Sequence, residues 1–287
     1  MHIRTKILTF IIIVTINIFG NSIITNPKIT QEITTNRCII TKDTILSLNL
    51  LDSCWRERQN IITQKSLGDY LLSAPFVPDD YEITWKTARL VYFIGNFGVG
   101  EKRFVDTKEG VKLFYYGVGL GKSAIKLNQS KVDGHYWYAI NLGSYGLAKG
   151  ILFAAANAKS GMNALKKAME IDPSYEFYGS SRILGRYYQE LPRIFGGSNA
   201  KALEMFLNAT KNSPEFDNNW LFLGRFYLSI KDYTNALSIC TNASKLPAQE
   251  GDAEEVRYKK EINKCIKDAK AGIFPSILPV ATHTDAR

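Results

Sequence analysis

Residues 220–227 have the sequence WLFLGRFY and constrain the fold of this chain more than any other segment. In a helix, Trp220, Leu223 and Tyr227 are three or four residues apart and therefore share one face. Gly224 has no side chain, so another helix can approach this face closely. A second segment with matching small residues follows in register, and its packing and terminating positions are Ala236, Cys240, Ala243 and Pro247.

This W-x2-L-G-x2-Y pattern opens a tetratricopeptide repeat, a helix pair that can bury its apolar face only against neighbouring pairs. Earlier segments share the same phase and begin at Trp85, Tyr136 and Ser181. We therefore predict an all-α fold, a tetratricopeptide-repeat helical solenoid of about four helix-pair repeats. The polar segment 253–270 is expected to form a C-terminal capping helix.

The expected repeat domain spans residues 43–271, and the segments on either side of it differ in composition. Residues 7–19 form an apolar run that follows a short basic region. Because this run is shorter than the roughly 20 residues of a membrane span, we interpret residues 1–22 as a signal peptide, with an N-terminal anchor as the alternative. Residues 23–42 are expected to be a spacer and residues 272–287 a flexible tail. The predicted location is periplasmic or secreted, and the alternative is tethering to the inner membrane.

Composition argues against several functional classes. The net charge is +9, but the basic residues are scattered and no nucleic-acid-reading motif occurs. The four cysteines form no C-x2-C pair and the chain has three histidines, so no metal site is expected. Cys240 occupies a core position of the last repeat, where it is either a small apolar residue or the disulfide partner of Cys265.

No catalytic constellation is visible, and we expect neither enzymatic activity nor a cofactor. Residues 116–123 (YGVGLGKS) resemble a phosphate-binding loop, but Tyr116 stands where that motif needs a glycine and the segment falls inside an expected helix. His135 follows the Asp133-Gly134 turn, and we expect it to cap a helix or lie on the surface rather than act as a base.

The first helix of each repeat is expected to line the concave side of the solenoid. Their positions within the repeats predict which residues face this side: Trp137 in one repeat, Arg182, Arg186 and Gln189 in the next, and Arg225 in the last. Arg182 and Arg186 are four residues apart and share a face. The arginines would form a cationic patch beside apolar residues, which suits a carboxylate-bearing ligand or an acidic segment of a partner. The alternative is that they pair with glutamates on neighbouring helices.

The middle repeats contain a further series of features in a specific order. They are YWYAINLG at 136–143, Ile171-Asp172-Pro173, RILGRYY at 182–188, Leu191-Pro192 and Gly196-Gly197. This series resembles the T component associated with tripartite ATP-independent periplasmic (TRAP) transporters, a family of periplasmic tetratricopeptide proteins. The resemblance covers roughly residues 45–250. Many members are lipoproteins, whereas this chain has no cysteine at the end of its apolar run.

The resemblance implies association with a periplasmic solute-binding protein and a trimer with an apolar ligand cavity. It carries over, mainly as structural markers, Trp137, Asn141, Gly185, Gly196 and Gly197. The predicted function is a non-enzymatic periplasmic binding protein, accessory to solute uptake. The alternative is a general protein–protein interaction adaptor of the cell envelope with no transport role. The candidate ligand- or partner-binding residues are Trp137, Asn141, Arg182, Arg186, Gln189 and Arg225.

Overall fold

The chain divides into two units, residues 1–37 and residues 38–287. The computed structural model describes residues 38–41, 43–73, 77–99, 104, 107–248 and 254–273, all of which belong to the second unit. The expected signal peptide, most of the expected spacer and nearly all of the expected tail lie outside the described residues.

The described part of the second unit is helical. Its helices are α3 (Leu48–Arg56), α4 (Ile61–Leu72), α5 (Tyr81–Phe97), α6 (Lys108–Leu127), α7 (Val132–Lys149), α8 (Ile151–Ile171), α9 (Tyr175–Glu190), the short 3-10 helix η1 (Arg193–Phe195), α10 (Asn199–Asn212), α11 (Asp217–Ser229), α12 (Tyr233–Ser244) and α13 (Glu255–Ile273).

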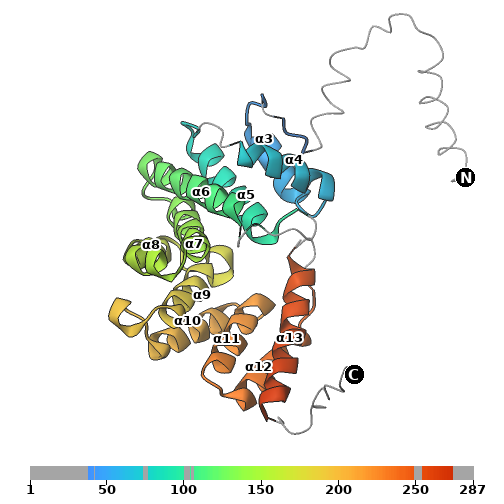
Figure 1. Cartoon of the computed structure of the whole chain (residues 1–287), viewed down its shortest axis with the longest axis vertical. Coiled ribbons are helices and arrows are strands. Elements are labelled where there is room, and N and C mark those ends of the chain that lie inside the picture. The colour runs from blue at the N-terminus through green and yellow to red at the C-terminus, as the bar shows by residue number, and fades with distance from the viewer. Residues whose placement is uncertain are drawn as a thin grey trace, which may run out of the picture. The chain divides into compact units, whose positions relative to one another are not determined.

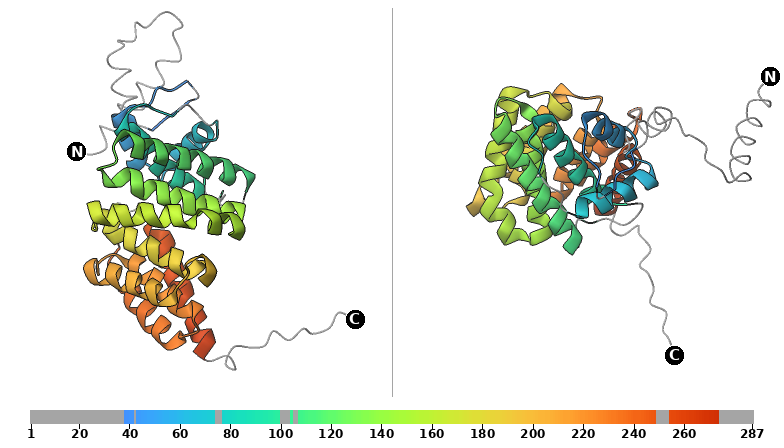
Figure 2. Two further views of the ribbon diagram at one scale, coloured as in Figure 1. Left: turned by 90° about the vertical axis from the view of Figure 1, so that its left-hand side faces the viewer. Right: turned by 90° about the horizontal axis from the view of Figure 1, so that it is seen from above.

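Four helix pairs make up the body of this unit: α5 with α6, α7 with α8, α9 with α10, and α11 with α12. Within the unit the pairs follow one another as stacked layers (Figures 1 and 2). Helices α3 and α4 pack on the first pair, and α13 packs on the last. The predicted all-α helical solenoid is therefore confirmed. No described helix is long and apolar enough to cross a membrane.

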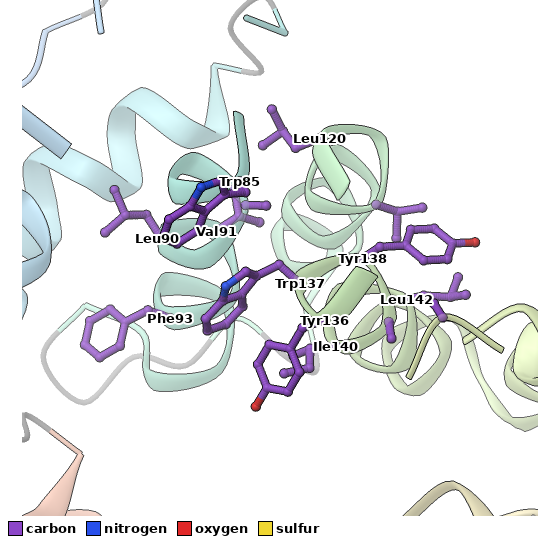
Figure 3. Packing of buried hydrophobic residues seen from close by; sticks show 14 of the residues in the cluster. Trp85, Leu90, Val91, Phe93, Leu120, Tyr136, Trp137, Tyr138, Ile140 and Leu142 are labelled. Carbon is purple, nitrogen blue, oxygen red and sulfur yellow. The ribbon is translucent and has the colours of Figure 1, made fainter. Parts of the chain in front are cut away.

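The pairs pack closely because small residues occupy the positions where helices cross. A methyl group added at Gly121 would lie 2.5 Å from Cα of Tyr138, so α6 and α7 could not approach as they do if this residue were larger. Around this crossing, Trp85, Val91 and Leu142 join the buried apolar cluster (Figure 3). The segment that resembles a phosphate-binding loop lies inside α6, as expected.

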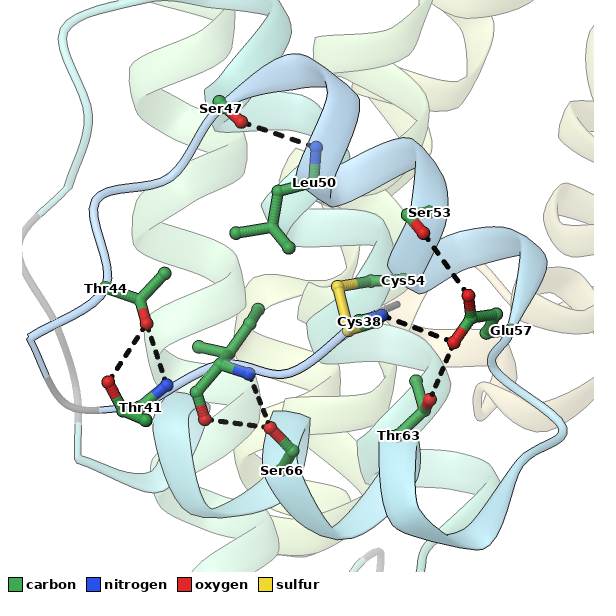
Figure 4. The surroundings of a disulfide bond; sticks show 11 residues. Cys38, Thr41, Thr44, Ser47, Leu50, Ser53, Cys54, Glu57, Thr63 and Ser66 are labelled. Carbon is green, nitrogen blue, oxygen red and sulfur yellow. Dashed lines mark hydrogen bonds between the residues drawn. A yellow bond between two sulfur atoms is a disulfide. The ribbon is translucent and has the colours of Figure 1, made fainter. Parts of the chain in front are cut away.

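The N-terminal end of the described unit is held by a disulfide. Cys38 is bonded to Cys54 of α3, and its backbone N–H donates to Glu57 at 3.2 Å (Figure 4). The last residues of the expected spacer are thus joined covalently to the helices. The two helices that follow, α3 and α4, are separated by a short turn. Asn60 caps the start of α4 by accepting from the N–H of Ile62 at 2.8 Å.

The C-terminal end carries the second disulfide, Cys240–Cys265, which joins α12 to α13. All four cysteines of the chain are therefore bonded. The N-terminal end of α13 lies beside α5: Arg257 donates to the backbone oxygen of Asn96 in α5 at 3.0 Å. The polar segment expected as a cap thus also contacts the first helix pair.

His135 differs from its expected role. It lies within the first turn of α7 and is only 8% exposed. One ring nitrogen lies 2.9 Å from the backbone oxygen of Gln129, so its ring is fixed to the loop that precedes the helix. The expectation of a capping or surface histidine is therefore wrong, because the α6–α7 loop folds over the ring.

Candidate binding groove

One large groove, called the concave groove here, runs along the inner faces of the stacked pairs. Its volume is about 780 Å³. One wall comes from the first helices of the four pairs and the other from Arg58 and the N-terminal half of α13. The lining includes aromatic, aliphatic, charged and amide side chains: Trp55, Arg58, Tyr92, Trp137, Ile140, Glu176, Phe177, Arg182, Arg186, Gln189, Glu190, Asn218, Arg225, Glu254, Arg257 and Glu261.

A buried ion pair closes one side of the concave groove. Arg58 lies between α3 and α4 and donates to Glu254, just before α13, at 2.8 and 3.3 Å, with both side chains 9% exposed. The Arg58 guanidinium also stacks over Trp55, 4.0 Å from the ring centroid. A two-point arginine–carboxylate contact fixes both distance and orientation, so this clasp sets how far α13 lies from the first helix pair.

The start of α9 forms a left-handed turn that faces the concave groove. Glu176, Phe177 and Tyr178 have φ values of 52°, 57° and 59°. Each such residue costs about 1–2 kcal/mol relative to right-handed geometry, and strain of this kind persists only where neighbours over-determine it. The turn brings Phe177, 44% exposed, against Phe216 with ring centroids 4.4 Å apart.

Arg182 is the main group that holds this turn. Its guanidinium donates to the backbone oxygens of Glu176 and Phe177 at 3.3–3.4 Å and to Asn219 Oδ1 at 2.6 Å. Asn219 is itself fully buried, and its amide donates to the backbone oxygen of Phe177 at 3.1 Å. Arg182 is 6% exposed, so its charge is engaged inside the protein. Its role is to position the turn whose side chains line the groove.

The other arginines form a more open network. Arg225 and Arg257 both pair with Glu261, while Arg186 lies 4.0 Å from Glu190. Burial, together with the nearby positive charges of Arg186 and Arg257, lowers the pKa of Arg225 to about 10. Arg225 therefore keeps its charge at neutral pH, and an anion placed among these three arginines would relieve their repulsion.

The structure brings five of the six candidate residues together. Trp137, Arg182, Arg186, Gln189 and Arg225 all line the concave groove. Their binding role stays a prediction. The alternative, pairing with glutamates on neighbouring helices, fits Arg225, which pairs with Glu261 of α13. Arg186 pairs within its own helix, and Arg182 donates to backbone oxygens and Asn219 instead.

Asn141 lies apart from the other five. It is fully buried and donates to the backbone oxygens of Ala88 at 3.0 Å and Trp137 at 2.9 Å. It also packs against Gly117, where any side chain would clash with it. Asn141 therefore joins helices α5, α6 and α7, and the contacts described for it are structural.

Several groove residues were missed from the sequence. Arg58, Glu254 and Arg257 lie outside the repeat signatures, and Arg58 and Glu254 are 196 positions apart. Phe177 was missed because a left-handed turn without glycine leaves no signal in the sequence. The one available hint was the cluster of glutamate and basic residues at the start of the expected capping helix. Within the described segments, no group of three or more His, Cys, Asp or Glu side chains could hold a metal ion.

Comparisons with known proteins identify a family. The family model for regulator of microtubule dynamics protein 1-3 matches residues 56–270. Regulator of microtubule dynamics protein 1 of Bos taurus is 26% identical over 193 residues, which is 62% of this chain and 59% of that protein. Protein 2 of Homo sapiens is 24% identical over 210 residues, which is 67% of this chain and 48% of that protein. The matched regions thus span only about half to three fifths of these relatives.

A solved structure, the thermophilic tetratricopeptide-repeat protein TTC0263 of Thermus thermophilus, has a TM-score of 0.49 and 17% identity. The match covers 75% of this chain and 92% of that one. The family match corrects the resemblance to the TRAP transporter T component, and with it the periplasmic transport-accessory function. That resemblance rested on features of the helical scaffold and of the α9–α10 connection, and a scaffold does not by itself imply a function. The chain belongs to the family of regulator of microtubule dynamics proteins 1–3.

Proposed function

We propose that this chain is a non-catalytic interaction module that holds a segment of a partner protein in the concave groove. The observation that carries the proposal is the groove itself, about 780 Å³ in volume and lined by aromatic rings and ion-paired arginines. Stacked helix pairs present such extended inner surfaces to partners. This function corresponds to the adaptor alternative expected from the sequence, without its assignment to a particular cell envelope.

We further propose that the module works in an oxidising compartment. Both disulfides involve buried cysteines, each at most 2% exposed. Disulfides persist in secreted and lumenal proteins and are rare where glutathione and thioredoxin keep thiols reduced. Export of the chain from the reducing cytosol, by the expected signal peptide or by another route, would allow both bonds to form and persist.

Family membership favours a second candidate, regulation of microtubule dynamics, because the names of the curated relatives state that role for them. The two candidates differ in compartment, since polymerised tubulin lies in the reducing cytosol. Co-sedimentation of the oxidised chain with microtubules separates them. We expect the chain to stay in the supernatant, and co-pelleting that survives physiological salt would favour the second candidate.

Site-specific photo-cross-linking in source cells tests the interaction function. A photoreactive residue replaces Gln189, which lies in the groove, or Lys166, an exposed residue of α8 outside it, as the matched control. We expect a discrete protein adduct from position 189 that is absent from position 166, and the adduct partner should rebind the purified chain. Equal labelling at both positions would contradict a groove-held partner.

A further inference from the structure

The concave groove has a side pocket, called the apolar pocket here, between α7, α8 and α9. Its volume is about 110 Å³. Ile140, Arg186 and Glu190 line both hollows, so the apolar pocket opens directly into the groove. An engineered apolar cavity of about 150 Å³ holds a benzene molecule, so this smaller pocket matches a single aliphatic side chain.

Small residues create the apolar pocket. Gly143 and Ala154 lie among its lining residues, and neither fills the space between the helices that carry them. Leu147 and Ile151 stand at its lining with 47% and 56% exposure. Half-exposed aliphatic residues beside an apolar hollow are typical of a site that an apolar group from another molecule covers.

Arg186 lies at the junction of the two hollows and is only loosely paired. Among the described residues, the guanidinium of Arg186 has one ion pair, 4.0 Å from Glu190, and no hydrogen bond of ordinary length. Arg225 and Arg257 both pair with Glu261. A further carboxylate, brought by a ligand, would accept charge-assisted hydrogen bonds from Arg186 and offset the repulsion that Arg186 and Arg257 exert on Arg225.

We propose that the concave groove and apolar pocket together recognise an extended peptide segment in which an aliphatic side chain lies within a few residues of a carboxylate. The aliphatic side chain enters the apolar pocket and the carboxylate lies against Arg186. Gln189 and Asn218 supply amide groups along the groove, and an amide can both donate to and accept from a peptide backbone. This assignment rests on the proposed interaction function and specifies the partner's chemistry.

The test is selection of a random 12-residue peptide library on the full oxidised chain. We expect enriched peptides that combine Leu, Ile or Val with Asp, Glu or a free C-terminal carboxylate within three positions. A synthetic enriched peptide should bind Ala154→Leu at least tenfold more weakly than the unmodified chain, by fluorescence anisotropy. Ala156→Leu, the same change on an exposed position of α8, is the matched control and should bind normally.

A second pair of variants tests the charge. Arg186→Glu should weaken binding at least tenfold, whereas Lys166→Glu, with the same charge change on exposed α8, should not. If Ala154→Leu fails to fold, Ile151→Lys places a charge at the half-exposed pocket lining instead. Normal peptide binding by both a pocket variant and Arg186→Glu would overturn the assignment.

The outcomes separate the two levels of the proposal. Enriched peptides without the aliphatic–acidic pattern would overturn this assignment and leave the interaction function standing. No enrichment over an uncoated support would overturn both. Displacement of the peptide by sodium decanoate at a lower concentration than by the unlabelled peptide would show that the site is built for an aliphatic carboxylate, and would overturn the peptide assignment alone.

Discussion

Two arginines of α9, one helical turn apart on the same face, differ in burial and in the number of their hydrogen-bond partners. Arg182 is 6% exposed and bonded to backbone oxygens and to Asn219. Arg186 is 43% exposed along its side chain and only loosely paired with Glu190. The groove lining around the two arginines differs accordingly. Around Arg182 it is a fixed polar network that shapes the wall, whereas Arg186 has one loose ion pair.

The difference teaches that helical phase identifies which side chains face a groove but not which of them are free to bind. The guanidinium of Arg182 is hydrogen-bonded because the left-handed turn at the start of α9 places the backbone oxygens of Glu176 and Phe177 within its reach. Arg186 has no such turn beside it. Tertiary neighbours, not position on the helix, decide the role of each arginine.

The largest expected effect comes from the disulfide beneath α11, the helix that carries both Asn219 and Arg225. Gly224 of this helix packs directly on Cys240. Replacing Cys240 and Cys265 together by Ala should lower the free energy of unfolding by about 3.5 kcal/mol, from the chain entropy of a loop of 25 residues. Urea denaturation measures the loss. Asn219, the partner of Arg182, and Arg225, the neighbour of Arg186, both belong to α11. The difference in stability between Arg182 and Arg186 variants should therefore persist when the disulfide is removed.

Arg182→Ala should lower the free energy of unfolding by about 3 kcal/mol. Hydrogen bonds to a charged group contribute roughly 1.5–3 kcal/mol. Removing the guanidinium takes its donors away from Asn219 Oδ1 and from the backbone oxygen of Glu176 in the strained turn, while the oxygen of Phe177 keeps the Asn219 amide. Urea denaturation, with hydrogen exchange of α9 as a local readout, measures the effect. A loss below about 1 kcal/mol would show that the turn is held by other contacts.

A double-mutant cycle measures the interaction energy between Arg182 and Asn219. Arg182→Ala and Asn219→Ala should show a coupling energy of about 1–3 kcal/mol, since contacting residues in one network are not additive. The same cycle between Arg186 and Asn219 serves as the control and should show less than about 0.5 kcal/mol. Additive behaviour of the first pair would mean that the 2.6 Å contact between them adds little to stability.

The smallest expected effect on stability is that of Arg186→Ala. A half-exposed ion pair contributes about 0–1 kcal/mol, so the free energy of unfolding should change by about 0.5 kcal/mol or less. Thermal unfolding checks this value. A loss of stability comparable to that of Arg182→Ala would remove the distinction between the two arginines and assign Arg186 a structural role.

The repeat architecture was predictable because it follows from local rules. Trp85, Gly121 and Gly224 lie at the offsets that helix-pair packing demands, and they occupy those packing positions in the structure. The chain's resemblance to a transporter component misled for the same reason. Gly185 packs on Phe206 of α10, and Gly197 lies against the backbone of Leu191 in the α9–α10 connection. Such contacts report how the scaffold folds and carry no information about partners.

The candidate site was predictable only in part. Helical phase placed Trp137, Arg186 and Gln189 on the groove-facing side, and the structure puts all three in the lining. Asn141 came from the resemblance to the transporter component, and the structure places it in the packing between helices instead. The sequence does not distinguish a buried amide from a groove-facing one, because only tertiary packing supplies the neighbours that differ.

The sequence by itself determined the helices, their pairing and the face that each pair turns inward, because periodicity and small-residue spacing act over a few turns of chain. Only the tertiary structure decided how the groove is closed and which charges are free within it. The clasp of Arg58 with Glu254 joins residues 196 positions apart, and the Cys38–Cys54 bond draws in a segment with no helical pattern. The first contact depends on the accumulated geometry of the four intervening helix pairs, and the second on a segment outside any helix, so no local helical pattern encodes either of them.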